Sequence, residues 1–102
     1  MAKIVFILQR RRDQTREQCL QRWSGATHIA IVRKLPGLIK WVQNHVVSAP
    51  GEAVCDGIGE LWFESDEALK STDMAAAVED AKNFLDMEKT GMVIVREQSV
   101  VG

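Results

Sequence analysis

The junction between a predicted helix and two predicted strands constrains the fold of this chain more than any other feature. The helical pattern ends at Leu35, because Pro36 cannot continue a helix and disfavours helical geometry at the residue before it. Gly37 then gives the backbone the freedom to turn. Residues 38–47 and 56–64 follow as strands, but several positions carry His, Asn, Asp, Glu or Trp where a structural strand would carry Val or Ile. This composition predicts a cavity beside the strands that holds water or a ligand.

The N-terminal third predicts a strand followed by a long helix. Residues 3–9 form a nearly continuous run of branched and aromatic side chains, which is typical of a strand buried on both faces. Thr15 and Gln18 have the spacing of a capping box, so a helix is expected to begin at Arg16 and to end at about Leu35. The buried face of this helix is expected to consist of Leu20, Trp23, Thr27, Ile31 and Leu35.

The C-terminal third predicts two helices and a last strand. Ser65 and the acidic residues after it favour a helix start, because a hydroxyl caps free N–H groups and acids suit the positive end of the helix dipole. A short helix at 66–71 is expected to give way to a longer one at about 73–88, and residues 92–98 form the final strand. The buried residues of the longer helix are expected to be Val78, Ala81, Phe84 and Leu85.

The order of these elements predicts an α+β fold. Strand, helix, strand, strand, helix, strand is the order of the ferredoxin-like βαββαβ plait, in which helices cover one face of an antiparallel sheet. The chain has 102 residues, so one domain over residues 1–102 is expected. A second copy of the same sheet is the available cover for the other face, which predicts a homodimer that encloses a barrel-like interior, a dimeric α+β barrel.

Charge and cysteine content exclude several classes of function. The chain has 13 basic and 14 acidic side chains, a balance that argues against nucleic-acid binding. Cys19 and Cys55 match no metal-binding spacing, so no metal site is predicted, and both are expected to be buried, reduced thiols of a cytoplasmic protein. Neither a signal peptide nor a stretch that could span a membrane is expected.

Two histidines and an aspartate are candidates for acid–base or binding roles. His28 lies on the predicted long helix at the edge of its apolar face, where a half-buried imidazole titrates near neutral pH. The alternative is a histidine whose ring nitrogens bond only a backbone carbonyl and water. His45, beside Asn44 on the second strand, either projects into a cavity or caps the strand end. Asp56 precedes the third strand, where its common role is a turn hydrogen bond.

Glu60 is the more unusual acid. Ile58 and Trp62 flank it on the same face of a strand, and such apolar surroundings raise the pKa of a carboxyl toward the range useful for a general acid or base. The alternative is a solvent-facing residue on an open sheet face, or an ion pair with Lys40 or Arg96.

Two tryptophans on neighbouring strands complete the candidate site. Core packing is the default role for Trp41 and Trp62, but on the face of Glu60 they would line an apolar pocket for an aromatic or cyclic ligand. Gly57 and Gly59 lack side chains, so another element or a ligand can approach the backbone there. Without a metal-ligand spacing or a glycine-rich phosphate loop, the chemistry is predicted to be cofactor-free, or to use a cofactor that a partner supplies.

The same residues resemble a known family. The pattern includes Trp23-Ser24, His28, the stretch 32–38, the stretch 41–45 and the stretch 56–65 with its Glu-Leu-Trp-Phe core. It is similar to the EthD-type proteins of the dimeric α+β barrel superfamily, which also holds methylmuconolactone methylisomerase and muconolactone isomerases. The likeness covers roughly residues 3–98.

The resemblance implies a ferredoxin-like protomer, a homodimer with sheets packed face to face, and a pocket between sheet and helices. His28 matches the family's helix histidine, which lies in the pocket of its isomerase members, and Glu60 matches the acid of the Glu-Leu-Trp-Phe stretch. Trp41 stands where many members have tyrosine, so a mechanism that needs a phenolic hydroxyl there is in doubt for this chain.

The leading functional prediction is an EthD-like catabolic protein with isomerase or lyase chemistry on a lactone or a cyclic or aromatic metabolite. His28 would be the acid–base group, and Glu60 or Asp56 would orient it or share its proton. One alternative is an accessory module that binds a ligand of an ether or aromatic degradation pathway without converting it. Another is a cofactorless or haem-dependent monooxygenase, with iron bound by a histidine. The predicted ligand-binding residues are Trp41, Trp62, Phe63, Trp23, His45 and Asn44.

Overall fold

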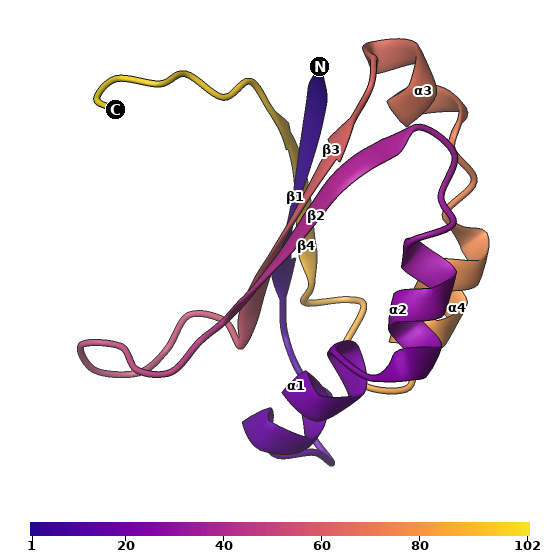
Figure 1. Ribbon diagram of the computed structural model, residues 1–102. Helices are drawn as coiled ribbons and strands as arrows, with labels where there is room; N and C mark the ends of the chain where they lie inside the picture. Colours follow the sequence, from indigo (N-terminus) through magenta and orange to yellow (C-terminus); the bar gives the residue numbers. More distant parts are fainter.

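A computed structural model describes residues 1–102 and shows a four-stranded antiparallel sheet with helices on one side. The strands are β1 (Ala2–Leu8), β2 (Leu38–His45), β3 (Gly57–Phe63) and β4 (Gly91–Val95), in the spatial order β2-β3-β1-β4. The helices are α1 (Arg16–Trp23), α2 (Ala26–Val32), α3 (Asp66–Ser71) and α4 (Ala75–Ala81). In Figure 1, α1, α2 and α4 lie on one side of the sheet, and no helix covers the other. The structure confirms the predicted ferredoxin-like α+β plait.

The strand register divides the sheet into two faces with different compositions. Paired residues share a face, and neighbours along a strand alternate between faces. Ile4 pairs with Leu61, and both are buried under the helices, which defines the helix face. Val5 pairs with Glu60 and points the other way, onto the face that we call the open face. The open face carries Lys3, Val5, Ile7, Lys40, Val42, Asn44, Ile58, Glu60, Trp62, Val93 and Val95.

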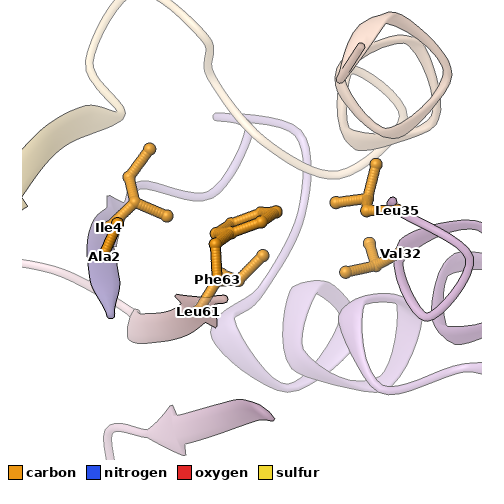
Figure 2. Close-up of a cluster of buried hydrophobic side chains, with 6 residues drawn as sticks. All are labelled: Ala2, Ile4, Val32, Leu35, Leu61 and Phe63. Atoms are coloured by element: carbon orange, nitrogen blue, oxygen red, sulfur yellow. The ribbon is translucent and has the colours of Figure 1, made fainter. Parts of the chain in front are cut away.

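The core lies between the helix face and the helices in two clusters. Phe63 is fully buried in the first cluster, between β1 on one side and the end of α2 on the other, as Figure 2 shows. Phe84, also fully buried, is part of the second cluster with Cys19 and Trp23 of α1. The first cluster consists of Ala2, Ile4, Val32, Leu35, Leu61 and Phe63.

The predicted long helix at 16–35 is wrong, because two shorter helices replace it. The Thr15–Gln18 capping box starts α1 as expected, but α1 ends at Trp23 and Gly25 adopts an extended backbone as the N-cap of α2. This break changes which residues face the sheet. Thr27, expected to be buried, is exposed, while His28 takes a buried position.

One other predicted boundary and two burial predictions also differ from the structure. The helix expected at about 73–88 spans only Ala75–Ala81, since tight turns replace it from Asn83 onward and bury Phe84 there. Val78, expected to be buried, is 38% exposed. The strand β1 is not buried on both faces, because Ile7 on the open face is 37% exposed within one protomer. None of the helices combines the length and apolar character needed to cross a bilayer.

Candidate functional site

A cavity of about 70 Å³ lies between the helix face of the sheet and the helices. It is larger than the roughly 10–15 Å³ that one water molecule needs, and smaller than the roughly 300–1,000 Å³ of pockets for drug-sized ligands. Its wall is apolar except at His28, Gly59 and Thr90. The other lining residues are Phe6, Leu8, Trp23, Val32, Leu35, Trp41, Leu61, Met74, Ala77, Val78, Ala81, Leu85 and Met87. The cavity therefore suits a compact and mostly apolar molecule.

His28 is the titratable residue of the cavity wall, and Asp80 of α4 holds its ring in place. The His28 side chain is 7% exposed, and its Nδ1 lies 2.9 Å from Oδ2 of Asp80. Arg22 donates from Nη2 to the other carboxylate oxygen of Asp80 at 3.2 Å. The rings of Phe84 and Trp41 meet the imidazole edge-on, with centroids 5.1 Å and 6.1 Å away. The imidazole orientation is therefore fixed by one hydrogen bond and two aromatic contacts.

The protonation state of His28 follows from this environment. Burial lowers the pKa of the imidazole, and the hydrogen bond to Asp80 only partly opposes that effect, so the pKa stays below its ordinary value of 6.5. At neutral pH the ring is therefore neutral, and Nδ1–H donates to Asp80. The other nitrogen, Nε2, has no hydrogen-bond partner in the protein. This atom is also not fully buried. An acceptor nitrogen thus remains free at the cavity wall.

Trp23 forms a second part of the wall because two glycines make room for it. A Cβ atom at Gly57 would lie 2.8 Å from Cζ3 of the indole, and one at Gly59 would lie 3.2 Å from Cζ2. His45 stacks on the indole with ring centroids 5.1 Å apart. The space predicted at these glycines is therefore filled by Trp23, which also lines the cavity.

The predicted site residues lie in several separate places in the structure. His28, Trp23 and Trp41 line the same cavity, as expected for a common site. Phe63 is fully buried in the core and does not line the cavity. His45 is exposed on the far side of Trp23, where its Nε2 lies 2.9 Å from Oε1 of Gln43.

Glu60, Trp62 and Asn44 lie on the open face, on the opposite side of the sheet from His28. Glu60 pairs with Lys3 at 3.4 Å, in place of the expected alternatives Lys40 or Arg96. Asn44 donates to Oε1 of Glu60 at 3.3 Å. The indole of Trp62 lies between the ammonium groups of Lys3 and Lys40, at 4.4 and 4.6 Å from its ring. Within one protomer these residues do not share a pocket with His28, because strand alternation separates them.

Asp56 anchors three segments of the chain. Its carboxylate accepts hydrogen bonds from the Arg10 N–H at 2.9 Å, from Arg10 Nη1 at 3.3 Å and from Arg16 Nε at 3.1 Å. Burial would raise the pKa of this carboxyl, but the hydrogen bonds from Arg10 and Arg16 outweigh it and hold the pKa below its usual range. Asp56 thus ties the end of β1 and the start of α1 to the start of β3.

The expected partnership of His28 with Glu60 or Asp56 is replaced by one with Asp80. Sequence reasoning missed Asp80, which lies 52 residues from His28 and has the surface pair Glu79–Lys82 beside it. Nothing in that segment distinguishes it from an ordinary exposed helical acid. The two cysteines are buried free thiols, as predicted, and burial raises the pKa of Cys19 to about 11. The structure contains no group of three or more His, Cys, Asp or Glu side chains arranged to hold a metal ion.

Comparison with solved structures supports the fold described above. No protein-family model matches the chain, and no curated protein matches it in sequence. An ethyl tert-butyl ether D (EthD) family protein from Bacillus halodurans has a similar structure, with a TM-score of 0.74 and 24% identity over 96% of this chain and 100% of that one. The resemblance to EthD-type proteins seen in the sequence is thereby confirmed at the level of the fold.

Two further solved structures share the fold at lower identity. HapK from Hahella chejuensis is 16% identical, with a TM-score of 0.70 over 100% of this chain and 96% of that one. A Bacteroides fragilis protein, described as dimeric, of unknown function and with a ferredoxin-like fold, is also 16% identical. Its TM-score is 0.65, and the match covers 94% of this chain and 95% of that one.

Proposed function

We propose that this protein catalyses a cofactor-free proton transfer within a small, fairly apolar cyclic molecule such as a lactone, with His28 as the acid–base group. The observation that carries the proposal is the His28–Asp80 pair at the wall of an apolar cavity, with one ring nitrogen held at 2.9 Å and the other free. The structural likeness to an EthD family protein supports a role in the catabolism of small molecules.

The neutral imidazole acts as a base toward a carbon acid. Nε2 takes a proton from a carbon next to a carbonyl group, the C–H bond breaks, and its electron pair delocalises onto the carbonyl oxygen. The imidazolium that forms is stabilised by Asp80 and then returns the proton to a different carbon of the same conjugated system. The result is an isomer of the substrate with no change in redox state, so the reaction requires no cofactor.

Aromatic and aliphatic walls support this chemistry. The apolar lining offers water few hydrogen-bond partners beside Nε2, and Trp41 and Phe84 hold the ring against rotation. Asp80 fixes the tautomer that leaves Nε2 unprotonated, while Arg22 keeps the carboxylate in place.

The test is proton exchange in heavy water. Wild-type protein and His28→Gln are incubated with small unsaturated lactones in D₂O, and deuterium incorporation and rearrangement are followed by NMR. A positioned acid–base group contributes about 10²–10⁴-fold in rate, so His28→Gln is expected to lose that factor while keeping its near-UV circular dichroism. His45→Gln is the matched control and should retain activity, because His45 lies outside the cavity. Equal exchange rates in wild type and His28→Gln would contradict the proposal.

Binding without exchange would favour the accessory module. In that outcome the wild-type protein saturates with a lactone, yet deuterium enters the ligand no faster than in buffer. The proton-transfer proposal would then fail, while the assignment of the cavity as a binding site would stand.

We also infer a homodimer that packs open face against open face. Val93 and Ile7 on this face are 47% and 37% exposed in the single protomer, an apolar exposure that a second copy would cover. The dimeric Bacteroides fragilis protein of the same fold supports this inference. Val93→Lys is expected to shift the sedimentation equilibrium toward monomer. Val47→Lys, at a residue that is 90% exposed outside the sheet face, should leave it unchanged.

A further inference from the structure

We propose that the indole N–H of Trp23 donates a hydrogen bond to the oxygen of a neutral carbonyl ligand, so that the cavity takes small ketones or lactones and rejects carboxylates. The proposal rests on the proposed function, because it names the ligand class of the same cavity. It adds a polar contact that positions the ligand opposite His28.

The first observation is an unsatisfied donor in a buried side chain. Trp23 is 3% exposed. The side-chain hydrogen bond at this residue runs from Gln43 Nε2 to its carbonyl oxygen and leaves the indole Nε1 without a partner in the protein. A buried tryptophan N–H normally finds a partner, since leaving one unpaired costs about 1–3 kcal/mol. The Nε1 atom itself is not fully buried, so it borders open space. Because Trp23 lines the cavity, we infer that this open space is the cavity.

The second observation is the orientation of the indole. Its Cζ3 edge lies against Gly57, which is not part of the cavity wall, and its Cζ2 edge lies against Gly59, which is. Cζ2 and Nε1 are bonded to the same ring carbon, so the N–H belongs to the Gly59 edge. The two glycines therefore set which edge of the ring faces the cavity.

The other polar groups of the wall do not offer an equivalent donor. The hydroxyl of Thr90 donates to the carbonyl oxygen of Gln9 at 3.5 Å and accepts from the N–H of Gln9 at 3.1 Å. Trp41 is only partly buried, so solvent is an alternative partner for its indole. The cavity thus combines one buried free donor, on Trp23, with one free acceptor, Nε2 of His28.

This pairing matches an enolisable carbonyl compound. The Trp23 N–H donates to the carbonyl oxygen, and this hydrogen bond becomes stronger as negative charge develops on that oxygen. Nε2 of His28 faces the carbon from which the proton is removed. A carboxylate has no such match, because the cavity wall contains no cationic side chain. Burial of an uncompensated charge in an apolar site is strongly unfavourable, so anionic lactones are expected to be excluded.

The experiment reads the indole N–H groups directly by ¹H–¹⁵N NMR. The chain has three tryptophans, so three indole cross-peaks are expected and can be assigned with Trp→Phe variants. The protein is titrated with cyclohexanone, cyclohexene and cyclohexanecarboxylate. Cyclohexanone is expected to move the Trp23 indole proton downfield, and cyclohexene is not. Cyclohexanecarboxylate is expected to leave the spectrum unchanged at ten times the Kd of cyclohexanone.

A variant separates the hydrogen bond from packing. Trp23→Phe keeps an aromatic wall but removes the donor, so it is expected to weaken cyclohexanone binding by about two- to tenfold relative to its effect on cyclohexene. Trp62→Phe is the control, because its indole lies on the open face and already donates to Glu97 at 3.1 Å. The wild-type titration requires no variant, so the test survives even if Trp23→Phe fails to fold.

Three outcomes would overturn the proposal. They are a downfield shift of the Trp41 peak instead of the Trp23 peak, equal effects of Trp23→Phe on ketone and alkene, and carboxylate binding as tight as ketone binding. None of these outcomes depends on turnover. Absence of deuterium exchange would instead overturn the proton-transfer step and leave the carbonyl contact in place.

Discussion

The two faces of the sheet satisfy their polar groups in different ways. On the helix face, His28 and Asp80 are almost sealed from solvent and meet at 2.9 Å beside an apolar cavity. On the open face, Lys3 lies 3.4 Å from both Glu60 and Glu97 and 4.4 Å from the ring of Trp62, among strand residues that are mostly apolar. A charge network around an indole suits a surface that meets another surface, whereas a single held imidazole suits chemistry on a ligand. The same strands thus form the wall of a cavity on one side and carry an exposed charge network on the other.

The difference between the two faces is tested most strongly by shortening one isoleucine on each of them. Ile4, on the helix face, is 2% exposed, so Ile4→Ala is expected to lower the free energy of unfolding by about 2–5 kcal/mol. Ile7, three residues along β1 on the open face, is 37% exposed, so Ile7→Ala should cost about 1 kcal/mol or less in a monomer. Urea unfolding at several protein concentrations measures both. A cost for Ile7→Ala that grows with concentration would show that a partner covers the open face.

A second prediction concerns the held imidazole. Asp80→Asn removes a charge-assisted hydrogen bond worth about 1.5–3 kcal/mol, so proton exchange is expected to fall by about 10- to 150-fold. Loss of the carboxylate removes the effect that raises the pKa of His28, so that pKa should fall further below its ordinary value. NMR titration of the His28 ring measures the shift. Glu79→Gln is the control, because Glu79 pairs only with the surface residue Lys82. A pKa that rises in Asp80→Asn would contradict the described pair.

The pH dependence of activity follows from the same pair. The base form of His28 is required, and its pKa lies below 6.5, so exchange activity is expected to rise with pH through that lowered pKa and to level off by neutrality. The folded state also binds this proton less tightly than the unfolded state. The corresponding stability is therefore present above pH 6.5 and is lost as the pH falls through the folded pKa.

A third prediction concerns Asp56, which lies outside both the cavity and the open face. Its pKa is lowered in the folded protein, so its contribution to stability is present above the unfolded value of about 3.9 and is lost as the pH falls through the folded pKa. Asp56→Asn is expected to cost about 1–3 kcal/mol at pH 7 and to flatten the acid limb of the stability curve. Asp13→Asn, in an exposed pair with Arg11, serves as the control. An unchanged acid limb in Asp56→Asn would show that another carboxyl controls acid unfolding.

The smallest expected effect concerns the network of the open face. Lys40→Met removes one of the two ammonium groups beside Trp62 and should lower the free energy of unfolding by about 0.5–1 kcal/mol. Lys34→Met, at an exposed lysine outside the sheet, should change it by less. Thermal unfolding of both variants measures the difference. Equal effects would indicate that the contact between Lys40 and Trp62 contributes nothing measurable.

Much of the fold follows from local signals in the chain. The capping box at Thr15 begins a helix, Pro36 prevents the helix from continuing into β2, and Ser65 caps α3 through the N–H of Ala68. Strand alternation, combined with the strand register, also places Trp41 and Glu60 on opposite faces of the sheet. The site was only partly predictable. His28, Trp23 and Trp41 were identified, but the choice of Glu60 as the partner of His28 placed residues from two faces in one pocket.

The sequence by itself determined the kinds and order of the elements, because caps, turns and apolar periodicity act over a few residues. Only the tertiary structure decided which strand face receives the helices, how the break at Gly25 turns His28 inward, and that Asp80 is its partner. These outcomes depend on contacts between segments far apart in the chain, where packing rather than local preference selects the arrangement.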